Sequence, residues 1–278
     1  MVGKKFSIFN FQFSIRSIRK LIKIWLLIAS RVAQIQLMTG WGGFAFLLGK
    51  IIRFLFFFVF IFSVLSKTRS LVGYSREQVV LFFLVFNLID ISTQALFRGV
   101  YQFRRLVVEG DYDFDLLRPL PSFFRPIFGW TDILDIITLI PLGIYFWLFV
   151  VRNNLFVNSA SVLIFILLFA NSMVLGFSLH LAICAVCVLT TEIDHLIWIY
   201  RDVTNTGRFP TDIYSKGIQY FLTFGVPVII LMTIPAEALL GLLTWRGMML
   251  SIVVTAVFFL LSWKFWRYSL SRYTSASS

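Results

Sequence analysis

The sequence predicts an all-α, polytopic membrane protein with six transmembrane helices preceded by an amphipathic helix at the membrane interface. Apolar residues make up 59% of its 278 residues, charged residues only 14%, and phenylalanine alone occurs 33 times. Soluble domains carry about a quarter charged residues, and a soluble fold of this composition would expose large apolar patches. Lipid is therefore the expected solvent for most of the chain.

Six apolar segments are long enough to cross a bilayer, which takes about 20 residues. They cover residues 46–66, 79–98, 127–151, 159–188, 217–235 and 248–266. Backbone polar groups in hydrocarbon must bond within the protein, so each segment is expected to be a helix. A crossing through 189–206 is rejected because it carries four charged residues, Glu192, Asp194, Arg201 and Asp202.

The N-terminal region has a different pattern. Apolar residues recur at helical spacing at Ile15, Ile18, Ile22, Trp25, Ala29 and Val32. Basic residues lie mostly off this stripe, at Arg16, Arg19, Lys20, Lys23 and Arg31. Such a helix rests in the membrane interface. We expect one transmembrane domain over 1–278, with an N-terminal region (1–40), the six-span bundle (46–266) and a tail (267–278).

Basic residues predict the orientation. With both termini inside, the inner segments carry 18 Lys and Arg residues and the outer segments carry 5. Cytoplasmic segments hold the excess of Lys and Arg, so both termini are expected in the cytoplasm. The net charge of +12 then suits anionic lipid headgroups, and nucleic acid is not an expected partner.

No nucleotide-binding or hydrolytic motif is evident. The nearest match to a phosphate-binding loop, Gly43 to Lys50, has the wrong spacing and lies in a predicted span, so this chain is not expected to hydrolyse ATP. His180, Cys184 and Cys187 share one helix face and could be soft metal ligands. Close helix packing is the favoured interpretation, so we expect no metal here and no loss of function when both cysteines are replaced.

Three carboxylates in the predicted spans are candidates for a translocation path, namely Asp90, Asp132 and Asp135. Ionisable groups in a span usually face a cavity or a partner. One interpretation is proton or ion coupling. The other is structural pairing with Arg98, or with Arg104 and Arg105.

The most acidic stretch runs from Glu109 to Pro121. Its alternating acids, Asp111, Asp113 and Asp115, could bind a divalent metal. The interleaved Tyr112 and Phe114 favour a protein-docking surface with aromatic anchors in a charged rim, which would include Arg118. Two prolines, Pro119 and Pro121, stiffen its exit.

This loop resembles a known family. Gly110-Asp111 followed by Asp115-Leu-Leu-Arg118-Pro119-Leu120 is similar to the first cytoplasmic loop of bacterial ABC-2-type permeases. The stretch Arg208-Phe-Pro-Thr-Asp-Ile-Tyr214 with Val226-Pro227 and Pro235-Ala-Glu237 resembles the fifth-span region of that family. The stretch from Trp266 to Tyr273, with the ending Ser275-Ala-Ser-Ser278, resembles its C-terminal signature.

The resemblance implies a permease subunit of an ABC exporter in the bacterial inner (cytoplasmic) membrane. It implies a second permease, identical or different, and a separate ATPase subunit that binds ATP and docks on the first loop and the N-terminal helix. It also implies an amphipathic or lipid-linked substrate. Two alternatives stay open: an ion-coupled transporter using Asp90 and Asp132, and an intramembrane enzyme using His180, Cys184 or Glu192.

Overall fold

A computed structural model describes residues 15–38, 40–45, 48–49, 51–52, 55–56, 59, 63, 71–191 and 194–274. Every regular element in this part of the chain is a helix. The longer helices are α1 (Ile15–Met38), α3 (Arg76–Phe97), α7 (Ile133–Arg152), α8 (Ser159–Thr190), α9 (Asp194–Thr204) and α12 (Trp245–Ser271). The shorter ones are α4 (Val100–Val108), α5 (Asp111–Leu116), α6 (Phe124–Phe128), η1 (Asn205–Arg208), η2 (Thr211–Ile213), α10 (Lys216–Tyr220), η3 (Phe221–Gly225), η4 (Ile229–Thr233) and α11 (Ile234–Leu239).

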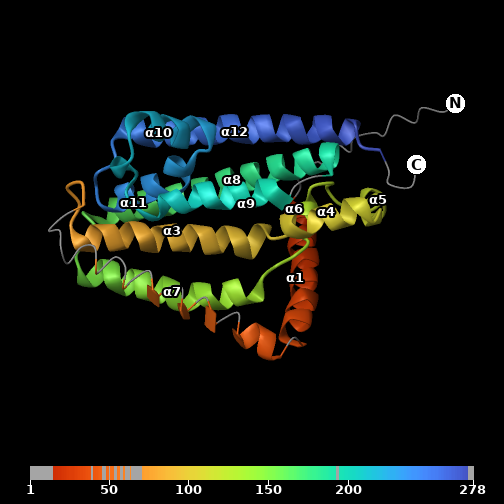
Figure 1. The fold of residues 1–278 in the computed structure, drawn as a ribbon, viewed down its shortest axis with the longest axis horizontal. Coiled ribbons are helices and arrows are strands. Elements are labelled where there is room, and N and C mark those ends of the chain that lie inside the picture. Colours follow the sequence, from red (N-terminus) through yellow and green to blue (C-terminus); the bar gives the residue numbers. More distant parts are fainter. Residues whose placement is uncertain are drawn as a thin grey trace.

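The long helices α3, α7, α8 and α12 run alongside one another, and α1 runs roughly perpendicular to them at the end of α3 and α7 (Figure 1). Four helical stretches in the described part are long and apolar enough to cross a membrane, or five if one sharply bent pair forms a span. The all-α membrane class is therefore confirmed. The predicted first span, 46–66, lies mostly outside the described residues, so the count of six stays a prediction.

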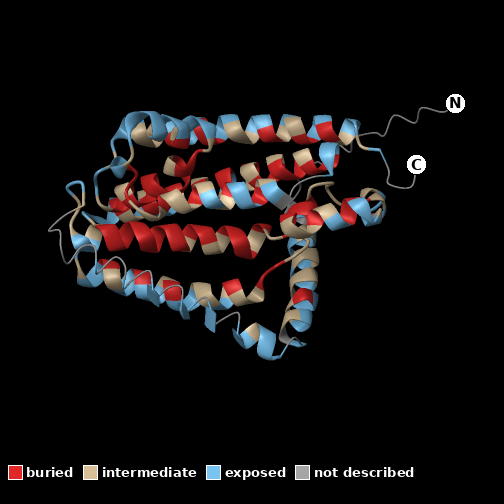
Figure 2. Ribbon diagram, in the orientation of Figure 1, coloured by how far each residue is buried: buried red, intermediate tan, exposed pale blue. Residues whose placement is uncertain are grey.

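Helix α3 is the central element of the bundle. Of the most apolar stretch of α3 and α4, 72% is buried, whereas the share is 22% in both α7 and α12. Figure 2 shows α3 buried almost all round, while α7 and α12 present exposed faces. A helix that is apolar on every side belongs inside the protein. The exposed faces of α7 and α12 are apolar, for example at Ile140, Leu148 and Leu260, and suit contact with lipid.

Local signals explain where these helices begin. Ser75 caps α3 in a reciprocal capping box with Gln78. Asp132 caps α7 by accepting hydrogen bonds from the backbone N–H groups of Leu134 and Asp135. Asn158 and Thr244 cap α8 and α12 in the same way. The predicted third span therefore begins at Ile133, several residues later than the expected residue 127.

The structure corrects the predicted fifth span. Residues 217–235 do not form one continuous crossing, because Lys216–Gly225 and Ile229–Leu239 meet at 83° around Pro227. Both ends of this bent pair lie at the same end of the bundle. Before it, Asp212 accepts a 2.7 Å hydrogen bond from Tyr74, which precedes α3. After it, Gly241 packs against Val157 in the α7–α8 loop. The pair is therefore a re-entrant hairpin.

The preceding segment, Asp194 to Ile213, runs the length of the bundle. Just before it, the Thr191 carbonyl accepts a 2.9 Å hydrogen bond from Arg104 at the end of the bundle that carries α4. Near its C-terminal end, Asp212 contacts Tyr74 at the opposite end. In length and composition this segment is not a candidate span among the described residues, in line with the rejection of a crossing through 189–206. Since the chain returns along the bundle once between α8 and α12, α12 runs in the predicted direction.

Candidate functional site

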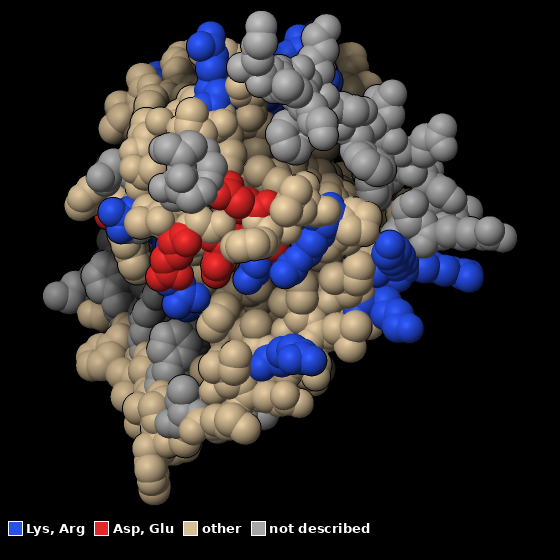
Figure 3. All heavy atoms as spheres, turned by 90° about the vertical axis from the view of Figure 1, so that its right-hand side faces the viewer, with Lys and Arg blue, Asp and Glu red and all other residues tan. Residues whose placement is uncertain are grey.

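The acidic loop folds as a short helix, α5, at the end of the bundle. Gly110 connects α4 to α5 with φ +79°, a left-handed conformation that glycine adopts at little cost. Figure 3 faces this end of the molecule, where Asp and Glu side chains gather and Lys and Arg side chains surround them. Asp111 and Asp113 lie in the first turn of α5, where the helix dipole favours negative charge.

The predicted docking residues differ in exposure. Asp111 and Arg118 are exposed and Asp113 is partly buried, but Asp115 is buried. Arg125 Nη1 lies 2.8 Å from both carboxylate oxygens of Asp115, and Arg118 Nη1 lies 3.3 Å from one of them. Asp115 therefore stabilises the turn between α5 and α6. It was expected in the exposed charged rim, but it is buried.

The two expected aromatic anchors also separate. Phe114 is 64% exposed, whereas Tyr112 is fully buried. Leu117, which the sequence reading did not single out, is 74% exposed. The apolar part of the α5 surface is therefore formed by Phe114 and Leu117. Their three-residue spacing on a helical turn was the available signal.

Tyr112 connects α5 to α12. Its ring packs edge-on against Phe103 and Tyr273, with centroids 5.0 and 5.5 Å away. Its hydroxyl donates to the carbonyl of Ser122, whose side chain accepts a hydrogen bond from Trp266. Burial raises the pKa of the Tyr112 phenol well above its ordinary value, so the ring stays neutral. Phe103, Tyr112, Trp266 and Tyr273 thus form one aromatic cluster.

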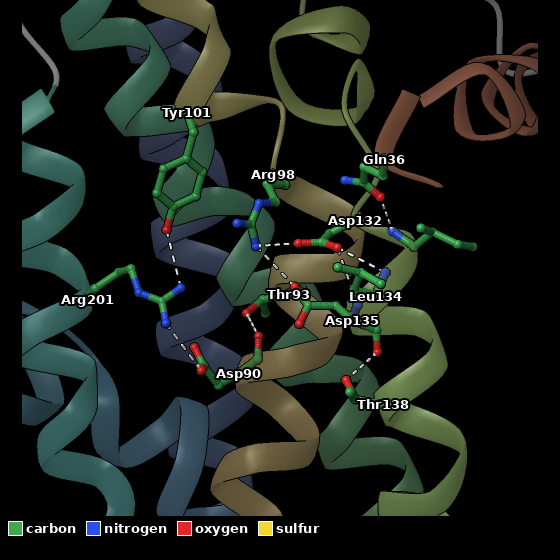
Figure 4. Close-up of polar contacts among 11 residues, drawn as sticks. Gln36, Asp90, Thr93, Arg98, Tyr101, Asp132, Leu134, Asp135, Thr138 and Arg201 are labelled. Carbon is green, nitrogen blue, oxygen red and sulfur yellow. Dashed lines mark hydrogen bonds and ion pairs between the residues drawn. The ribbon is translucent and has the colours of Figure 1, made fainter. Parts of the chain in front are cut away.

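The carboxylates predicted for a translocation path are all paired with arginine (Figure 4). Arg98 Nη1 lies 2.8 Å from Asp132 and 3.1 Å from Asp135. Asp90 lies 3.5 Å from Arg201 on α9. The expected pairing with Arg98 is confirmed for Asp132 and Asp135, but Asp90 pairs with Arg201 and not with Arg98, Arg104 or Arg105.

Tyr101 joins the two ion-pair groups. It lies 3.3 Å from Arg201 Nη1, and the guanidinium of Arg98 lies 5.7 Å above its ring. A polar chain thus links α7, α3, α4 and α9. Removing one member of a buried ion pair costs about 3–5 kcal/mol because the other charge is left unpaired. Sequence reasoning missed Arg201, because its partner is 111 residues away in the chain.

His180, Cys184 and Cys187 are fully buried in the core around α8. The His180 Nδ1 atom lies 2.7 Å from the carbonyl oxygen of Gly176, and its ring packs against Tyr200 and Phe97. No group of three or more His, Cys, Asp or Glu residues in the described part of the chain could hold a metal ion. Glu192, the third candidate for intramembrane chemistry, lies outside the described residues.

The apolar, exposed faces of the long helices and the paired polar chain inside the bundle are those of a multi-pass membrane protein. A family model described as "ABC-2 family transporter protein" matches residues 47–277. The chain therefore belongs to the ABC-2 transporter family, as the membrane permease component of an ABC transporter. No curated protein and no solved structure matches the chain.

Proposed function

We propose that this chain is the permease of an ATP-driven exporter in the bacterial inner membrane. A separate ABC ATPase binds and hydrolyses ATP and docks on α5, and a second permease, identical or different, completes the pore. The substrate is amphipathic or lipid-linked, a class that rests on the family resemblance. Membership of the ABC-2 family supports the ATPase partnership.

The observation that carries this proposal is the construction of α5. An isolated six-residue helix is too short to be stable, yet here it is tied to α4, α6 and α12 through Tyr112 and Asp115. It nevertheless leaves Phe114 and Leu117 exposed. A rigidly mounted apolar pair within a charged rim has the anatomy of a protein-binding surface.

In this proposal the end of the bundle that carries α5 faces the cytoplasm. Arg104, Arg105, Arg118 and Arg125 lie on the elements at this end, and α12 ends here with Arg272. The re-entrant hairpin moves Lys216 to the opposite end, and Arg208 lies inside the bundle beside Phe86. With Lys216 and Arg208 no longer counted at the α5 end, that end still carries more Lys and Arg residues than the opposite end. This excess supports cytoplasmic termini.

Ion coupling loses its main support. Asp90, Asp132 and Asp135 each lie within 3.5 Å of a guanidinium. Pairing with a partner inside the protein is the structural alternative to a coupling role for such groups. The ATP-driven mechanism is therefore the better-supported proposal.

The test replaces the exposed apolar pair, in the double variant Phe114→Ser/Leu117→Ser. Burying one such side chain stabilises a contact by about 1.5–3 kcal/mol, so binding of the co-expressed ABC ATPase should weaken at least about tenfold. Pull-down and substrate-stimulated ATP turnover are the measurements.

The matched control is Leu242→Ser, since Leu242 is half exposed but lies after the hairpin at the opposite end. It should leave ATPase binding unchanged. Wild-type pull-down and turnover in the double variant would refute docking on α5. The surface of α1 would then be the next candidate.

A further inference from the structure

A cavity of about 300 Å³ lies between α1 and the segment from α5 to α6. One wall comes from α1, through Ile24, Ile28, Arg31 and Val32. The facing wall is formed by Asp115, Arg118, Leu120, Pro121, Ser122, Phe124, Arg125 and Gly129. A second cavity of about 190 Å³ shares Val32, Arg125 and Gly129 with it and adds Arg105. The two cavities therefore lie next to each other.

The lining of the larger cavity carries a positive charge. Three arginines, Arg31, Arg118 and Arg125, face it together with Asp115, its one acidic residue among those described. Both contacts to Asp115 use only the Nη1 atoms of Arg118 and Arg125. Each guanidinium has five N–H donors, so donors remain on both. Arg31 is exposed and lies within ion-pair distance of no acid in the described part of the chain.

The cavity lies near the end of the bundle where α7 begins. Gln36 on α1 accepts a 3.0 Å hydrogen bond from the backbone N–H of Ile133, the first residue of α7. Helix α1 therefore crosses the bundle at the start of α7. Its outer face exposes Ile18, Ile22 and Leu26, which is the property of a helix embedded at the acyl–headgroup boundary.

We propose that this cavity binds the phosphate group of an anionic phospholipid. Arg31 and Arg118 donate to the phosphate oxygens, for which the planar guanidinium is well suited. Ile24 and Ile28 contact the glycerol and the first methylenes of the acyl chains. The position beside the lipid-facing surface of α1 favours a membrane lipid over a soluble phosphate. Such a lipid would join α1 to the α5–α6 turn, and this inference does not depend on where the ATPase docks.

The test uses the full chain purified in detergent, delipidated and titrated with short-chain phosphatidylglycerol. Native mass spectrometry counts the bound lipid, and phosphatidylcholine and glycerol 3-phosphate are titrated in parallel. Arg31→Gln removes one charge-assisted contact and should weaken phosphatidylglycerol binding about tenfold. Ile28→Trp should reduce binding by filling the cavity. Arg19→Gln, on α1 but outside the cavity lining, is the matched control and should stay within about twofold of wild type.

Three results would overturn the proposal. The first is equal phosphatidylglycerol binding in wild type, Arg31→Gln and Ile28→Trp. The second is tighter binding of glycerol 3-phosphate than of the lipid, which would identify a soluble phosphate ester as the ligand. The third is unchanged lipid binding together with loss of ATPase pull-down in Arg31→Gln, which would make the cavity part of the protein interface. Failure of Phe114→Ser/Leu117→Ser to affect the ATPase leaves these outcomes unaffected.

Discussion

The ion pair between Asp90 and Arg201 helps α9 to pack inside the bundle. The charged residues between Asp194 and Asp202 would make an isolated helix of this sequence costly to bury in lipid. In the folded protein, Arg201 keeps only 18% of its side chain exposed and meets Asp90 and Tyr101. The partner on α3 therefore pairs one of these charges, Arg201, inside the bundle.

We expect the two residues to be strongly coupled in stability. Asp90→Leu and Arg201→Leu should each lower the thermal midpoint, because each leaves one charge buried and unpaired, at about 3–5 kcal/mol. The double variant Asp90→Leu/Arg201→Leu should lose clearly less stability than the two single variants lose together, since apolar replacement of a whole buried pair is often nearly neutral. Thermal unfolding of the detergent-solubilised protein measures this cycle. Additive effects of the two single changes would show that the pair does not interact.

At the scale of the helix, the close approach of α4 to α6 depends on Gly99. Its backbone N–H donates a 3.2 Å hydrogen bond to the carbonyl of Ile127. A Cβ at this position would lie 2.7 Å from the carbonyl oxygens of Pro126 and Ile127. Backbone atoms cannot turn away as a flexible side chain can, so the two elements would have to separate.

Gly99→Ala should therefore destabilise the protein by about 1–3 kcal/mol, the usual cost of overpacking. Gly143→Ala is the matched control, because a Cβ there meets no atom within 4 Å and alanine favours the helix by up to about 1 kcal/mol. Chemical unfolding monitored by tryptophan fluorescence gives both values. Equal midpoints for the two variants would contradict the close approach.

Continuous apolar helices were predictable from the sequence and interrupted ones were not. Predicted spans over 159–188 and 248–266 match α8 and α12, since an uninterrupted apolar run is sufficient to identify a helix in lipid. The hairpin at Pro227 was missed, because hydropathy measures how apolar a segment is and not in which direction the chain leaves it. Within the candidate site, the α5 loop and the three carboxylates were found. Their arginine partners on other helices depend on tertiary contacts, and only Arg98 was anticipated.

For the whole molecule, the hairpin changes which loops face which side of the membrane. Ser215 begins α10 and is exposed next to Tyr214, at the end of the bundle opposite α5. A continuous span over 217–235 would place Ser215 on the same side as α5. In the structure the two lie at opposite ends of the bundle.

Cysteine labelling distinguishes these topologies. In a Cys184→Ala/Cys187→Ala background, a membrane-impermeant maleimide applied to intact cells should label Ser215→Cys and not Leu117→Cys, because α5 is proposed to be cytoplasmic. The background itself should transport normally, since both cysteines are buried in the core. Protection of Ser215→Cys in intact cells, with labelling after permeabilisation, would restore the continuous fifth span.

The internal ion pairs also have a consequence for biosynthesis. Asp135 follows Arg98 by 37 residues, whereas Arg201 follows Asp90 by 111. As the nascent chain leaves the ribosome, α3 is therefore complete before the arginine that pairs with Asp90 has been synthesised. Until then α3 is poorly suited to free lipid and is expected to stay beside the insertion machinery. The synthesis of α9 thus determines when the central helix can be released into the bilayer.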